Sequence, residues 1–100
     1  EQFREALRLK PEYVDGHVNL AIVLEEGGNL DQAIEQYRAA LWIAPQDADL
    51  HCSLGELLEK QGRTAEAVQE YRSALGINPQ HAVAGQRLRA ATSSTPATPG

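Results

Sequence analysis

The sequence is poor in the features that mark disulfide-stabilised, metal-binding or membrane-spanning proteins. Cys52 is the only cysteine among 100 residues, so neither an internal disulfide nor a cysteine-based metal motif can form. No apolar run approaches the roughly 20 residues that a membrane-spanning helix needs, and no signal-peptide pattern opens the chain. The lone cysteine fits a reducing compartment and so favours the cytoplasm, although it does not determine the location.

Basic residues are also few, and they are scattered. The chain has 9 Lys and Arg against 14 Asp and Glu, a formal net charge of −5. Without a basic patch, neither a nucleic-acid backbone nor an anionic membrane surface is expected as partner. The chain opens at Glu1 within a motif already under way, and we interpret it as a fragment of a longer protein.

One short pattern occurs three times. It reads aromatic, Arg, any residue, Ala, Leu, any residue, aliphatic, any residue, Pro, and it occupies residues 3–11, 37–45 and 71–79. Its closing prolines, Pro11, Pro45 and Pro79, therefore recur with a constant period of 34 (45 − 11 and 79 − 45). Aligned over this period, residues 14–47 and 48–81 are identical at 14 of 34 positions. A fixed period of this size indicates a repeat protein.

Helical spacing and helix-ending residues predict six helices, at residues 1–10, 14–26, 30–43, 48–60, 64–77 and 81–92. Gly28 and Gly62 are expected to end helices in the left-handed conformation. Asn29 is predicted to cap the next helix, with Gln32 at capping-box spacing, and Asp47 is predicted to cap the helix that follows it.

Apolar and small residues at helical spacing predict the packing faces. Leu20, Ala21 and Leu24 form the expected stripe of the second helix. Ala40 and Ala74 are expected at helix crossings that admit no larger side chain.

These features resemble the tetratricopeptide repeat family. The family pattern of Trp-x2-Leu-Gly-x2-Tyr, Ala-x3-Phe and Pro lies over His17, Leu20, Ala21, Leu24, Ala33, Tyr37 and Pro45, and again over His51, Leu54, Gly55, Leu58, Ala67, Tyr71 and Pro79. The resemblance implies an all-α fold, an α-solenoid of helix-turn-helix repeats. Its expected parts are a repeat domain at 1–92, divided into 1–13, 14–47, 48–81 and 82–92, and a disordered tail at 93–100.

Candidates for chemistry are sparse. His17 and His51 stand one repeat period apart, and His51 is next to Cys52, but zinc requires four ligands in tetrahedral arrangement. We interpret both histidines as packing residues, and we predict no enzyme activity, no metal and no cofactor. Trp42 aligns with Arg8 and Gly76, which indicates a surface position.

In the resembling family the first helices of the repeats line a concave groove that holds a peptide or a partner helix. Carried over, this predicts an acidic groove with an apolar floor of Val18, Ile22 and Cys52. Of the family's chaperone-binding carboxylate clamp only Arg87 is kept. The predicted groove residues are Asp15, Val18, Asn19, Ile22, Glu25, Glu26, Asp49, Cys52, Ser53, Glu56, Glu59 and Lys60.

The sequence therefore predicts a protein-interaction module whose partner is a protein or peptide, a basic amphipathic segment. Two alternatives stay open. One is a self-assembly element, a weak homo-oligomer formed through its end helices, where Phe3 and Leu7 lack a neighbour. The other is a recruiting arm of an enzyme whose catalytic domain lies elsewhere.

Overall fold

The computed structural model describes residues 11–93, which form five helices and no strand. The all-α solenoid is confirmed. The helix predicted at residues 1–10 lies outside the described residues, so five of the six predicted helices can be compared. The tail predicted at 93–100 also lies outside them except for Ser93, which belongs to the last helix and not to the tail. None of the five is long and apolar enough to cross a membrane. They are α2 (Pro11–Glu26), α3 (Leu30–Ile43), α4 (Ala48–Lys60), α5 (Thr64–Ile77) and α6 (Ala82–Ser93).

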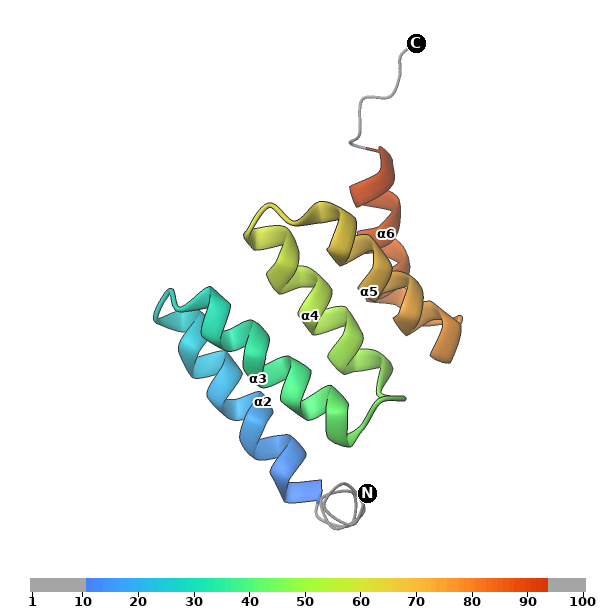
Figure 1. Ribbon diagram of the computed structural model, residues 1–100. Helices are drawn as coiled ribbons and strands as arrows, with labels where there is room; N and C mark the ends of the chain where they lie inside the picture. The colour runs from blue at the N-terminus through green and yellow to red at the C-terminus, as the bar shows by residue number, and fades with distance from the viewer. Residues whose placement is uncertain (1–10, 94–100) are drawn as a thin grey trace.

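The helices stack as antiparallel pairs (Figure 1). α2 packs against α3, and α4 packs against α5. α3 also contacts α4, which joins the two repeats, while α6 packs on α5 and reaches α4. α4 is thus covered on both sides, whereas among the described helices α2 packs only against α3, and α4 reaches it through the side chains of Lys60 and Glu25.

Glycines close the first helix of each repeat as the sequence predicts. Gly28 has φ 84° and Gly62 has φ 79°, a conformation that costs glycine little. At the first turn the N–H of Asn29 donates to the carbonyl of Leu24 at 2.8 Å, and at the second the N–H of Arg63 donates to Leu58 at 2.9 Å. These bonds use carbonyls that a helix end otherwise leaves unpaired.

Helix starts agree with the predictions only in part. Asp47 caps α4, because its carboxylate accepts from the N–H of Leu50 at 3.2 Å. The capping box at Asn29 is wrong: Asn29 precedes α3 but its side chain makes no capping bond, since its φ of −89° and ψ of 69° lie outside the extended region of a capping residue. α2 begins at Pro11, three residues earlier than predicted, because proline suits the first turn of a helix.

The core lies along the seam between the paired helices. Ala40 and Ala74 are fully buried, as predicted, and so are Ala21 and Leu58. The predicted burial of Leu20 is wrong, since this side chain is 45% exposed. α2 has no described helix on the side where α4 has α3.

Gly55 makes room for the largest fully buried side chain of the core. A Cβ placed on Gly55 would lie 2.6 Å from Cε1 of Tyr71. The two helices of the second repeat approach closely there, and the Tyr71 ring fills the space that the missing side chain leaves.

Candidate partner-binding surface

Five charged side chains line a cavity of about 380 Å³ on the surface formed by α2, α4 and α6. Glu25 comes from α2, Arg87 from α6, and Glu56, Glu59 and Lys60 from α4. Four of them belong to the predicted groove. Glu25 and Glu59 are counterparts one repeat period apart, so the stacking of the repeats brings the ends of α2 and α4 to the same place, and α6 supplies Arg87 beside them.

The two cations of the cavity pair with carboxylates from a neighbouring repeat. Lys60 donates to Glu25, which raises the pKa of the lysine through this hydrogen bond and the charge of Glu25. Arg87 Nε donates to Glu56 Oε2 at 3.2 Å. Both cations are more than half exposed, so the pairs are weak and sensitive to salt.

Glu59 accepts a hydrogen bond from a side chain of the core. The hydroxyl of the buried Tyr71 donates to its Oε1. Burial, then this hydrogen bond and the charge of Glu59, raise the pKa of Tyr71. This carboxylate therefore anchors α5 to α4 and is the least able of the three to leave its partner.

The predicted apolar floor needs correction. Cys52 is only 4% exposed, and burial together with the charge of Glu56 raises the pKa of its thiol to about 11. Val18 is partly buried, whereas Ile22 is 41% exposed. Val83 on α6 is 44% exposed and was absent from the predicted groove. The sequence does indicate it, because Val83 is the counterpart of the predicted groove residue Asp49 one repeat period later.

The remaining predicted residues spread along the same helices. Asp15, Asn19 and Glu26 are exposed on α2, and neither of the two carboxylates pairs with a cation within residues 11–93. Asp49 is exposed on α4 and accepts from His81 Nε2 at 2.7 Å. Ser53 is partly buried.

The two histidines at the family's Trp position join the helices of each pair. His17 Nδ1 lies 2.7 Å from the amide oxygen of Gln36. His51 Nδ1 lies 2.8 Å from Glu70 Oε1, and its Nε2 lies 3.0 Å from the carbonyl oxygen of Pro45. Within the described residues no group of three or more His, Cys, Asp or Glu side chains could hold a metal ion.

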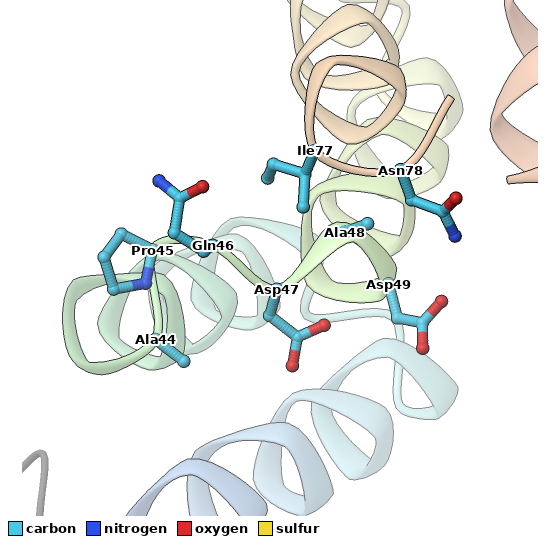
Figure 2. Close-up of a pocket in the computed structure, with 8 residues that line it drawn as sticks. All are labelled: Ala44, Pro45, Gln46, Asp47, Ala48, Asp49, Ile77 and Asn78. Atoms are coloured by element: carbon cyan, nitrogen blue, oxygen red, sulfur yellow. The ribbon is translucent and has the colours of Figure 1, made fainter. Parts of the chain in front are cut away.

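A larger cavity of about 690 Å³ lies beside the connection between the two repeats and not in the predicted groove. Its walls come from the connection between α3 and α4 and from the end of α5 (Figure 2). Asp47 there is already engaged in capping α4. Of the residues that line it, only Asp49 was predicted to bind a partner.

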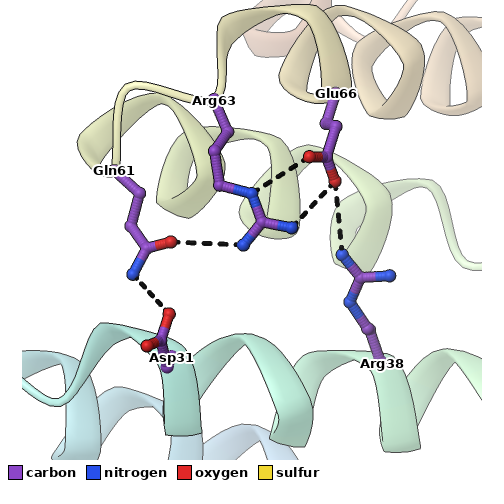
Figure 3. Close-up of polar contacts among 5 residues, drawn as sticks. All are labelled: Asp31, Arg38, Gln61, Arg63 and Glu66. Carbon is purple, nitrogen blue, oxygen red and sulfur yellow. Dashed lines mark hydrogen bonds and ion pairs between the residues drawn. The ribbon is translucent and has the colours of Figure 1, made fainter.

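A polar network that the sequence did not reveal joins the repeats along α3 and α5 (Figure 3). Gln61 donates to Asp31 at 2.7 Å, and Arg38 lies 3.6 Å from Glu66. Arg63 links the two contacts, donating to Glu66 through Nε and Nη2 at 3.0 Å each and to Gln61 at 3.2 Å. The pKa of Glu66 is lowered, first by the hydrogen bond from Arg63.

Two family models match the chain. One, described as TPR repeat, covers residues 24–62, and the other, described as tetratricopeptide repeat, covers residues 48–81. Together the matches run without a gap from residue 24 to residue 81. No curated protein matches the sequence.

Several solved structures share the fold. The APC/C hetero-tetramer Cut9-Hcn1 aligns with TM-score 0.77 at 20% identity over 82% of this chain, which spans only 16% of that one. The second TPR of Spaghetti (RPAP3), bound to the HSP90 peptide SRMEEVD, gives 0.79 at 16% identity over 86% of this chain and 80% of that one. A mutant of MamA gives 0.72 at 20% identity over 90% of this chain and 66% of that one.

Proposed function

The chain belongs to the tetratricopeptide repeat family, and from this premise we propose that it is a non-catalytic protein-interaction module that binds a basic amphipathic segment across α2, α4 and α6. The repeats support a general protein-binding role. The sign of the partner's charge and the face that it occupies rest on the charges and exposure of this chain's own residues.

The excess of carboxylates on this face carries the proposal. The proposed surface carries two cations, Lys60 and Arg87, and six carboxylates, which gives it a formal charge of −4. The carboxylates are those of Asp15, Glu25, Glu26, Asp49, Glu56 and Glu59. Lys60 and Arg87 already pair with Glu25 and Glu56, so the unpaired charges are negative. Complementary charge on a partner speeds the encounter and disfavours partners of the wrong sign.

Exposed apolar side chains on the outer two of these helices supply the second half of the argument. Ile22 on α2 and Val83 on α6 are each more than 40% exposed. An amphipathic segment can lay apolar side chains on them while its Lys or Arg residues reach the carboxylates of α2 and α4. Its cations can also replace Lys60 at Glu25, because that pair is exposed.

The neighbour bound to SRMEEVD shows that this fold can hold a peptide, but that peptide carries three acidic residues. In this chain the positions that match the family's carboxylate clamp hold Val18, Ile22, Ser53, Val83 and Arg87, and Arg87 is paired with Glu56. We therefore propose a basic partner and expect acidic peptides to be rejected.

The test is calorimetric titration with a basic and an acidic amphipathic peptide at low and high salt. We expect the basic peptide to bind in the micromolar range, roughly −8 kcal/mol, with affinity falling as salt is added. Glu26→Lys should weaken binding several-fold, since Glu26 is exposed and has no cation partner in the described residues.

Glu35→Lys is the matched control. It makes the same change in net charge at an exposed position of α3, away from the proposed surface, and should leave the affinity within about twofold. Equal weakening by both variants would show that only net charge matters. Equal binding of the acidic and basic peptides would refute the proposed surface and direct the search toward the face around Trp42.

A further inference from the structure

A histidine occupies the capping position at the start of α6. His81 directly precedes Ala82, the first residue of the helix, and its Nδ1 accepts a hydrogen bond from the N–H of Ala84 at 3.1 Å. Its backbone carbonyl accepts from the N–H of Gly85, also at 3.1 Å. A side-chain acceptor at this position satisfies one of the N–H groups that the start of a helix leaves unpaired. His81 is therefore the cap of α6.

The same position one repeat period earlier is held by an aspartate. Asp47 is the counterpart of His81, and Leu50, whose N–H it accepts at 3.2 Å, is the counterpart of Ala84. The two caps have the same geometry but different chemistry. An aspartate carboxylate remains an acceptor throughout the pH range in which histidine titrates, whereas an imidazole nitrogen accepts only while it carries no proton. Of these two caps, only that of α6 is lost when a histidine is protonated.

The contacts of His81 define the form of the imidazole that the cap requires. Because Nδ1 accepts from Ala84, the ring proton lies on Nε2, which donates to Asp49 Oδ1 at 2.7 Å. The ring has little contact with solvent, since the side chain of His81 is 12% exposed. A second proton would bind at Nδ1 and set the N–H of the ring against the N–H of Ala84. It would also bring positive charge to the positive end of the helix dipole.

Asp49 is the charged group that opposes this loss of the cap. It faces His81 from α4, but its side chain is 87% exposed, so solvent weakens its added attraction for a charged ring. Arg89 of α6 lines the same cavity of about 320 Å³ as His81 and disfavours a second positive charge there. From α5 this cavity is lined by Leu75, which is apolar. The surroundings of His81 therefore do not compensate for the lost capping bond.

We propose that His81 is a pH-sensitive cap, which holds the first turn of α6 while its ring is neutral and releases that turn when the ring is protonated. The capping bond belongs to the neutral form, so its stabilising effect is present at neutral pH and is lost as the pH falls through the range in which histidine gains its proton. This inference does not depend on the proposed function. If that function holds, Val83 in the released turn is the part of the partner surface that acidification disturbs.

Amide hydrogen exchange in the full chain, at about pH 7.5 and about pH 5.5, tests the proposal without a partner. Protection factors, which correct for the pH dependence of exchange itself, are compared for the amides of Ala84 and Leu50. We expect Ala84 to lose at least about fivefold in protection at the lower pH, while Leu50, capped by Asp47, stays within about twofold. His81→Asp should remove the difference, because it gives α6 the same kind of cap as α4.

The ring nitrogens of His81 provide a second measurement that needs no variant. At neutral pH their nitrogen-15 chemical shifts should show the proton on Nε2, and the amide shift of Ala84 should follow the titration of the ring. A proton on Nδ1 at neutral pH would overturn the inference, and so would equal protection of Ala84 at both pH values. An equal loss at Leu50, or a pH dependence that persists in His81→Asp, would also overturn it, because another group would then be responsible.

Discussion

Replacing Gly55 by alanine tests the closest helix contact of the fold. The added Cβ would lie 2.6 Å from Cε1 and 2.9 Å from Cδ1 of Tyr71, and because carbon atoms sit comfortably at about 3.5 Å, the ring must move by about 1 Å. Tyr71 is fully buried and its hydroxyl bonds Glu59. The ring therefore cannot move without straining both its packing and this hydrogen bond.

The magnitude follows from opposing terms. Overpacking costs about 1–3 kcal/mol, and a weakened hydrogen bond to a carboxylate adds about 1 kcal/mol. Alanine in place of glycine within a helix returns about 0.8–1.0 kcal/mol. We expect Gly55→Ala to lower the free energy of unfolding by about 2 kcal/mol net, measured by urea denaturation followed by circular dichroism.

Gly76→Ala in α5 supplies the control. No atom lies within 4 Å of a Cβ placed there, so this variant gains the same helix propensity without the clash and should be more stable by about 0.5–1 kcal/mol. Should Gly55→Ala prove as stable as Gly76→Ala, the close approach of α4 and Tyr71 would be refuted.

Three further predictions follow from caps, buried alanines and the thiol. Asp47→Ala should destabilise by about 1 kcal/mol, whereas Asn29→Ala, which loses no capping bond, should change the denaturation midpoint little; equal losses would contradict the difference in capping. Ala74→Glu should abolish cooperative unfolding near room temperature, because burying an unpaired charge costs several kcal/mol, while Ala65→Glu at an exposed position of the same helix should melt close to the parent. The folded pKa of Cys52, about 11, lies above the ordinary value of 9.0, so its contribution to stability is complete below pH 9 and is lost as pH rises toward 11. Cys52→Ala removes the thiol and should reduce the fall in the free energy of unfolding between pH 9 and pH 11, measured by urea denaturation at several pH values. An unchanged fall would contradict the raised pKa of Cys52.

The sequence predicts the bounds of the three central helices better than it predicts burial on α2. The bounds of α3, α4 and α5 agree residue for residue because Gly28, Asp47, Gly62 and Pro79 act through local backbone geometry. The misplaced burial of Leu20 has a different origin. Burial depends on whether another helix stands alongside, and periodicity within one helix carries no information about that neighbour.

For the candidate surface, too, the sequence predicts the positions of residues better than their pairing and burial. The repeat period places Glu25, Glu56, Glu59 and Lys60 on equivalent turns, and these residues do meet at one cavity. The sequence does not show that Lys60 neutralises Glu25, because this pairing joins residues far apart in the chain on neighbouring repeats. Nor does it show that a cysteine on the predicted face turns into the core.

The contacts that α3 makes with the start of α5 and with the turn before it also have a mechanical consequence. Bending that brings α2, α4 and α6 closer together must pull α3 away from the start of α5. The ion pair of Arg38 with Glu66 and the hydrogen bond of Gln61 with Asp31 resist that separation, and the ion pair is exposed enough to weaken in salt. Under the proposed function, the spacing of the partner surface therefore depends in part on side chains that lie outside it.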